Sequence, residues 1–197
     1  PAPLAVVCHD AGAANILFAW IAAAGISDTC LPVMLGPAAR LWAERFPNGP
    51  DVMQLEAAMA EASFLLSGTG WASDLEHQAR SLARRTGMAS AAVIDHWVNY
   101  AERFSFEGET VLPDQILVAD EYALAEARRA VPGLPVRVLP NLYLAEQIAG
   151  IAPLPEQGGD VLYLLEPARN DWGRGQPGEF QALDFFFSRY NKLGISP

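Results

Sequence analysis

Three short stretches of this sequence contain acid–base side chains, or glycines beside an aromatic ring. They are HDAGAAN at 9–15, SGTGW at 67–71 and DHW at 95–97. Imidazole and carboxylate groups transfer protons near neutral pH, and glycines let a ligand approach the main chain. Indole rings offer a flat apolar face to a sugar. Together these residue types predict acid–base chemistry on a sugar or nucleotide ligand.

Each stretch directly follows an apolar run, and such runs alternate with helical patterns along the chain. The expected strands are Leu4–Cys8, Leu31–Leu35, Val52–Leu55, Ser63–Ser67, Ala89–Ile94, Gln115–Ala119 and Val136–Leu139. Most of these runs are apolar throughout instead of alternating with polar residues, which is typical of parallel strands covered on both faces. The pattern therefore predicts an α/β protein with a Rossmann-like, doubly wound parallel sheet.

The carboxyl ends of parallel strands lie at one edge of a sheet, and open α/β sheets bind their ligands there. With a strand order of 3-2-1-4-5, the loops after Cys8 and Ser67 face each other across a crevice. The helix expected over 13–24 also offers unpaired N–H groups to a phosphate or carboxylate. We expect seven residues to line this crevice: His9, Gly12, Gly68, Thr69, Gly70, Asp95 and His96.

The candidate catalytic residues are His9, Asp95 and His96, and either histidine could be the general base. Neighbouring residues of an extended strand point to opposite faces, so we expect Asp10 not to orient His9 unless the loop bends. The candidate substrate-binding residues are Asp10, Gly12, Asn15, Gly68, Thr69, Gly70, Trp71 and Trp97.

Structural roles are the alternative for several of these residues. The glycine loops are also consistent with tight turns before helices, and both tryptophans with core or interface positions. Glu76 and His77 are expected to lie on a solvated helix face. Tyr100, Glu102 and Arg103, in the irregular segment 98–113, are candidates for lining the cleft.

Composition limits the class of protein. The formal net charge is −10, which argues against a nucleic-acid partner. The two cysteines, Cys8 and Cys30, are expected at opposite ends of neighbouring strands, too far apart for a disulfide, so we expect free thiols and a cytoplasmic location. Apolar runs are too short to span a membrane, and metal-ligand spacing is lacking. We therefore expect neither a membrane segment nor a metal or other cofactor.

The domain boundaries are indicated by proline and glycine. Residues 1–151 form the Rossmann-like domain, and the Pro/Gly-rich segment 152–159 is expected to be a linker. Residues 160–197 then contain an expected strand, Asp160–Leu165, and an aromatic helix, Glu179–Leu193. One strand and one helix cannot bury a core of their own. This part is therefore either the start of a second Rossmann-like domain or a unit that docks on the first.

The chain resembles the amino-terminal domain of GT-B-type glycosyltransferases and of the related sugar-nucleotide 2-epimerases. The resemblance rests on HDAGAAN after the first strand, SGTGWASDLE after a middle strand and DHW after the next. It also rests on LPDQILVADEYA followed by PVRVLPN, and on VLYLLEP after the linker. It covers nearly the whole chain in pattern.

The resemblance implies an acceptor-binding domain that acts with a sugar nucleotide and a glycan acceptor in glycan or polysaccharide biosynthesis. In such enzymes the donor lies mainly on the second domain, so we expect this 197-residue chain to be inactive alone. The alternatives are a sugar-nucleotide epimerase or hydrolase, and a non-catalytic Rossmann-like binding domain. The sequence leaves the donor, the acceptor and the oligomeric state open.

Overall fold

The computed structural model describes residues 2–153, 162–165 and 173–190 of the chain. The chain divides into two compact units, Pro1–Ile151 and Ala152–Pro197.

The first unit is built on a six-stranded sheet in which all paired strands are parallel. Its strands are β1 (Leu4–Cys8), β2 (Cys30–Met34), β3 (Phe64–Ser67), β4 (Ala89–Val93), β7 (Gln115–Val118) and β8 (Val136–Val138). The order across the sheet is β2-β1-β3-β4-β7-β8. The predicted α/β doubly wound fold is thus confirmed, with the change of direction between β1 and β3.

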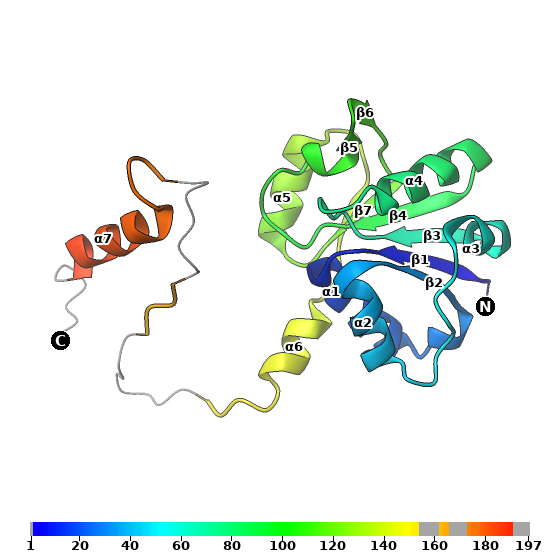
Figure 1. Cartoon of the computed structure of the whole chain (residues 1–197), viewed down its shortest axis with the longest axis horizontal. Coiled ribbons are helices and arrows are strands. Elements are labelled where there is room, and N and C mark those ends of the chain that lie inside the picture. The colour runs from blue at the N-terminus through cyan, green and yellow to red at the C-terminus, as the bar shows by residue number, and fades with distance from the viewer. Residues whose placement is uncertain (1, 154–161, 166–172, 191–197) are drawn as a thin grey trace. The chain divides into compact units, whose positions relative to one another are not determined.

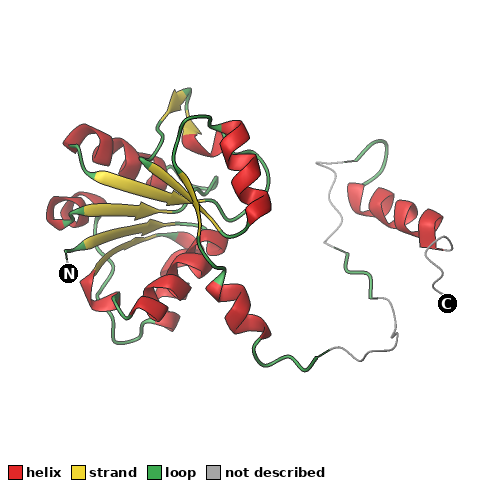
Figure 2. Ribbon diagram, turned by 180° about the vertical axis from the view of Figure 1, so that it is seen from behind, coloured by secondary structure: helices red, strands yellow, loops and turns green. Residues whose placement is uncertain are grey.

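The helices cover both faces of this sheet (Figures 1 and 2). They are α1 (Ala11–Ala24), α2 (Gly36–Arg45), α3 (Leu55–Glu61), α4 (Leu75–Thr86), α5 (Glu121–Ala130) and α6 (Leu142–Ile148), with a 3-10 turn η1 (Ser27–Thr29). Helices α1 and α2 pack on one face through Val6 and Cys8 of β1, whereas α3 and α4 pack on the other through Ala5 and Val7. This alternation explains why β1 is apolar throughout.

One expected strand is absent, and this changes the strand order from the predicted one. Residues 51–54 are irregular, and Leu55 already begins α3. Met53 donates one main-chain hydrogen bond to Pro32 O (2.7 Å), but no strand ladder follows. The chain therefore crosses directly from edge strand β2 to β3 on the far side of β1.

The segment expected to be irregular, 98–113, contains a small antiparallel hairpin. A 3-10 turn, η2 (Glu102–Phe104), leads into β5 (Ser105–Phe106) and β6 (Glu109–Thr110). Glu107 and Gly108 have φ values of 48° and 84°. Positive φ at both central positions is what a two-residue hairpin turn requires. Phe104, beneath the hairpin, is fully buried against α5 and β7.

Local residue types account for the ends of several helices. Gly25 and Gly87 adopt φ of 63° and 70° and end α1 and α4, as left-handed residues commonly do. The Asp120 side chain accepts a hydrogen bond from Ala123 N (2.7 Å) at the start of α5.

Cys8 and Cys30 are free, buried thiols.

The second unit contains one helix in its described part, α7 (Gly178–Tyr190). The strand expected over 160–165 is not formed within Leu162–Leu165, which are irregular, and 160–161 lie outside the described residues. Tyr163 contacts the Phe186 ring of α7, with centroids 4.7 Å apart. With no neighbouring strand in the described part of this unit, Leu162–Leu165 lack the ladder partners that a strand needs.

Candidate functional site

His9 and Asp10 form a side-chain pair at the carboxyl end of β1. His9 Nδ1 lies 2.6 Å from Asp10 Oδ1, and the two side chains are 18% and 31% exposed. Asp10 thus orients His9, which was expected only if the loop between them and α1 bends. β1 ends at Cys8 and α1 begins at Ala11, so the chain turns between them and brings both side chains to one side.

The second oxygen of Asp10 connects this pair to the loop after β3. Trp71 N donates to Asp10 Oδ2 at 3.2 Å. A β-carbon on Gly70 would lie only 2.5 Å from the same oxygen, so the close approach needs a glycine. The loops after β1 and β3 thus meet at the point where the strand order changes direction, as the sequence predicted for His9 and Gly70.

Gly36, at the first position of α2, lies against the His9 ring. Its φ is +50°, and a β-carbon there would come within 2.6 Å of His9 Nε2. His9 O also accepts a hydrogen bond from Ala38 N in the first turn of α2. Gly36 was not among the residues expected at the site, although a glycine before the helix-starting Pro37 was a usable signal.

Glu76 of α4 binds the main chain of His9. The prediction that Glu76 is solvated is wrong. Glu76 is 1% exposed, and its Oε1 accepts the His9 main-chain N–H at 2.9 Å. Its Oε2 is buried and has no hydrogen-bond partner among the described residues. Burial raises the pKa of the Glu76 carboxyl, although the hydrogen bond from His9 N opposes this shift. Helical spacing alone did not reveal that this turn of α4 lies under β1.

Asp95 covers the first turn of α1. A β-carbon on Gly12 would lie 1.8 Å from Asp95 Oδ2, which places this carboxylate directly on the Gly12 main chain. Asp95 Oδ1 lies 3.3 Å from Arg103 Nη1 in a largely buried ion pair. The helix end that the sequence suggested for an external anion therefore already faces a carboxylate of the protein itself.

Thr69 and Gly68 lie inside the loop after β3. Thr69 is 1% exposed, its hydroxyl donates to Val93 O (2.9 Å), and its carbonyl accepts from Arg103. Gly68 packs against the Cys8 thiol and Glu76, which a β-carbon would approach to 2.9 and 3.2 Å. Both residues shape the loop from within.

Two buried arginines hold these loops together. Arg80 of α4 donates to the carbonyls of Gly68, Arg103 and Val111, and burial lowers its pKa to about 10. Arg103 donates to the carbonyls of Thr69 and Val98. The sequence analysis placed Arg103 near the cleft but missed Arg80, because helical periodicity does not distinguish a buried guanidinium from a solvated one.

The two tryptophans are exposed and are held in place by polar neighbours. Trp71 is 53% exposed, with the Arg103 guanidinium 5.3 Å from its ring centroid. Trp97 is 55% exposed, and its Nε1 donates to Asp120 Oδ2 at 3.0 Å. His96 accepts a hydrogen bond from Trp97 N through Nδ1 (3.0 Å). Within the part of the chain that the structure describes, His96 makes no hydrogen bond or ion pair with His9 or Asp10.

Asn15 lies one turn further along α1 and lines a different cavity. This cavity of about 270 Å³ lies beside α1, α2 and α6, and Phe18, Leu41 and Tyr143 also line it. The structure thus brings His9, Asp10, Gly70 and Trp71 into direct contact, with Asp95 and Gly12 beside them, whereas Asn15 faces elsewhere.

Residues 2–153, 162–165 and 173–190 contain no cluster of three or more His, Cys, Asp or Glu side chains placed to hold a metal ion. Within the same residues, no helix is long and apolar enough to cross a bilayer.

Comparison of the chain with protein-family models, with curated proteins and with solved structures finds no match.

Proposed function

We propose that this chain is the acceptor-binding domain of a GT-B-type glycosyltransferase and that His9 is its general base. The observation that carries the proposal is the 2.6 Å contact between His9 Nδ1 and Asp10 Oδ1 at the carboxyl edge of the sheet. A carboxylate that accepts from Nδ1–H leaves Nε2 with a lone pair, which is the form of imidazole that removes a proton.

In the proposed reaction, Nε2 of His9 takes the proton of an acceptor hydroxyl as that oxygen attacks the anomeric carbon of the donor. The bond from this carbon to the phosphate of the leaving nucleotide breaks in the same step. Asp10 holds the ring and stabilises the imidazolium that forms. The Glu76 carboxyl fixes the main chain of His9 through its 2.9 Å hydrogen bond.

Charge at this edge supports an acceptor more than a donor diphosphate. Asp95 lies over the first turn of α1, and the guanidiniums of Arg80 and Arg103 already donate to main-chain carbonyls. A diphosphate needs available N–H groups or cations, whereas a sugar hydroxyl needs a base and a stacking surface. Trp71 and Trp97 offer exposed rings of that kind.

The test compares variants of the natural protein that contains this chain in an assay for nucleotide release from UDP-, GDP- and CMP-sugars with mixed glycan acceptors. We expect His9→Gln and Asp10→Asn each to lower kcat by ~10²–10⁴-fold. Asp28→Asn, in η1 at the opposite edge of the sheet, is the matched control and should retain the wild-type rate.

The same assay separates the alternatives. If His96→Gln abolishes transfer while His9→Gln does not, the base is assigned wrongly. Transfer by the 197-residue chain alone at about 1 s⁻¹ would contradict the need for a second domain. Release of nucleotide without acceptor would instead identify a sugar-nucleotide hydrolase.

A further inference from the structure

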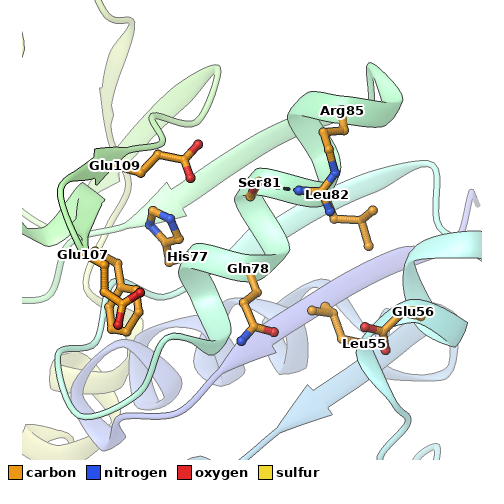
Figure 3. A pocket seen from close by; sticks show the side chains of 10 residues that line it. Leu55, Glu56, His77, Gln78, Ser81, Leu82, Arg85, Glu107 and Glu109 are labelled. Carbon is orange, nitrogen blue, oxygen red and sulfur yellow. Dashed lines mark hydrogen bonds between the residues drawn. The ribbon is translucent and has the colours of Figure 1, made fainter.

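Two cavities lie side by side along α4, on the sheet face that α3 and α4 cover. One has a volume of about 210 Å³ and begins at Gly70 and Trp71. The other, of about 390 Å³, lies between the β5–β6 hairpin and α3 (Figure 3). His77, Phe106 and Glu107 line both cavities. We call the two together the hairpin groove.

The hairpin groove begins next to the His9–Asp10 pair. Trp71, which lines its first cavity, donates its main-chain N–H to Asp10 Oδ2 at 3.2 Å. Gly70, in the same lining, is in close contact with that carboxylate. A single loop, Gly70–Trp71, therefore separates the groove from the His9–Asp10 pair.

Two exposed aromatic rings line the first cavity. Trp71 is 53% exposed and Phe106 is 38% exposed. Arg103 lies 5.3 Å from the Trp71 ring centroid, and the His77 ring lies 5.7 Å from that of Phe106. Both rings are thus supported from one side, which leaves flat apolar surface for the C–H face of a pyranose.

The second cavity is lined mainly by side chains that donate and accept hydrogen bonds. Figure 3 shows His77 close to Glu107 and Glu109 of the hairpin, and Gln78 across from Glu56 of α3. Such a set of planar polar groups matches a ligand covered with hydroxyls. The cavities' volumes are of the order of the ~300–1,000 Å³ typical of small-molecule sites.

The charges in the groove favour an uncharged ligand. Three arginines and four glutamates line the two cavities. Arg80 and Arg103 donate to main-chain carbonyls, and Arg85 donates to Ser81 at 2.8 Å. Because the positive groups do not outnumber the carboxylates, an anionic chain gains no net attraction there.

We propose that the hairpin groove binds the glycan acceptor as a neutral oligosaccharide, with one sugar between Trp71 and Phe106 and the following sugars along α4. The identity of the bound glycan as an acceptor rests on the proposed function. Its binding to the groove does not, because it follows from the cavities and their lining.

The experiment titrates the 197-residue chain with tetra-N-acetylchitotetraose, maltotetraose and the anionic tetragalacturonate, and follows amide chemical shifts by NMR. We expect at least one neutral tetrasaccharide to bind, with shifts concentrated at 70–71, 77–85 and 105–109. Phe106→Ala should weaken this binding about tenfold. Ile148→Ala, an exposed apolar residue of α6 on the α1 side of the sheet, is the control and should leave it unchanged.

Three results would overturn the proposal: no binding of either neutral tetrasaccharide, shifts that map outside the groove, or equal binding of tetragalacturonate. His9→Gln separates this inference from the proposed function. If the neutral glycan binds wild type and His9→Gln alike but His9→Gln retains transfer, glycan binding in the groove is supported and the assignment of His9 as the base is contradicted. If transfer needs His9 but Phe106→Ala does not change the KM for acceptor, His9 is supported as the base and acceptor binding in the groove is contradicted.

Discussion

The carboxylate of Asp95 lies on the main chain of Gly12, where a β-carbon would approach its Oδ2 to 1.8 Å. This contact joins the end of β4 to the first turn of α1 across the carboxyl edge of the sheet. It places a fixed negative charge where the helix end would otherwise attract an external anion. A side chain at position 12 would therefore displace the Asp95 carboxylate, and the carboxylate favours an acceptor over a donor phosphate at this edge.

Gly12→Ala should reduce the free energy of unfolding by about 1–3 kcal/mol, because the added methyl group displaces the Asp95 carboxylate from a packed position. Urea denaturation measures the change. Gly150→Ala is the matched control, since nothing lies within 4 Å of a β-carbon there and its φ is not positive. We expect that control to change stability by less than about 0.5 kcal/mol. Equal effects at the two glycines would contradict the Asp95 contact.

Arg80→Lys should destabilise the protein by about 1–3 kcal/mol, although the charge is kept. The guanidinium reaches three carbonyls at once, whereas an ammonium cannot span them, so at least one buried carbonyl loses its donor. Arg84→Lys is the control on the same helix. Arg84 pairs with Glu109 while half exposed, so its replacement should cost less than about 1 kcal/mol. A similar loss at both positions in thermal or urea unfolding would show that Arg80 has no special role.

Glu76 should make stability fall as pH rises above about 4.5. Burial raises the pKa of Glu76 in the folded state above its ordinary value of 4.5. Between these two pKa values the unfolded chain has lost the Glu76 proton while the folded chain keeps it, so its contribution to the free energy of unfolding decreases with pH. This contribution is fully present below pH 4.5.

Glu76→Gln removes this titration but keeps an oxygen that can accept from His9 N. The free energy of unfolding of wild type minus that of Glu76→Gln, measured in urea at a series of pH values, should therefore decrease from pH 4.5 upward. Glu76→Ala also removes the acceptor and should cost a further ~1–3 kcal/mol at every pH. If this difference in the free energy of unfolding instead increased with pH, the pKa of Glu76 would be lower in the folded protein than in the unfolded chain, which would contradict the prediction.

The sequence by itself determined most of the elements of the first unit and the edge of the sheet that carries the candidate site. Continuous apolar runs such as Leu4–Cys8 predict buried parallel strands, because both faces of such strands must be covered. Glycine and aspartate at helix ends are local signals, so Gly25, Gly87 and Asp120 could be read directly. His9 and Gly70 were placed together for a topological reason, since both follow parallel strands.

Tertiary structure alone decided which side chains contact one another at that edge. Local patterns favoured a strand at 52–55, but strand pairing depends on long-range partners that no local signal contains. The turn between β1 and α1 brings Asp10 to His9. The burial of Glu76 and Arg80 depends on where α4 packs. Gly36 approaches the His9 ring because α2 begins beside β1. Such contacts join residues far apart in the chain, so only the folded packing determines them.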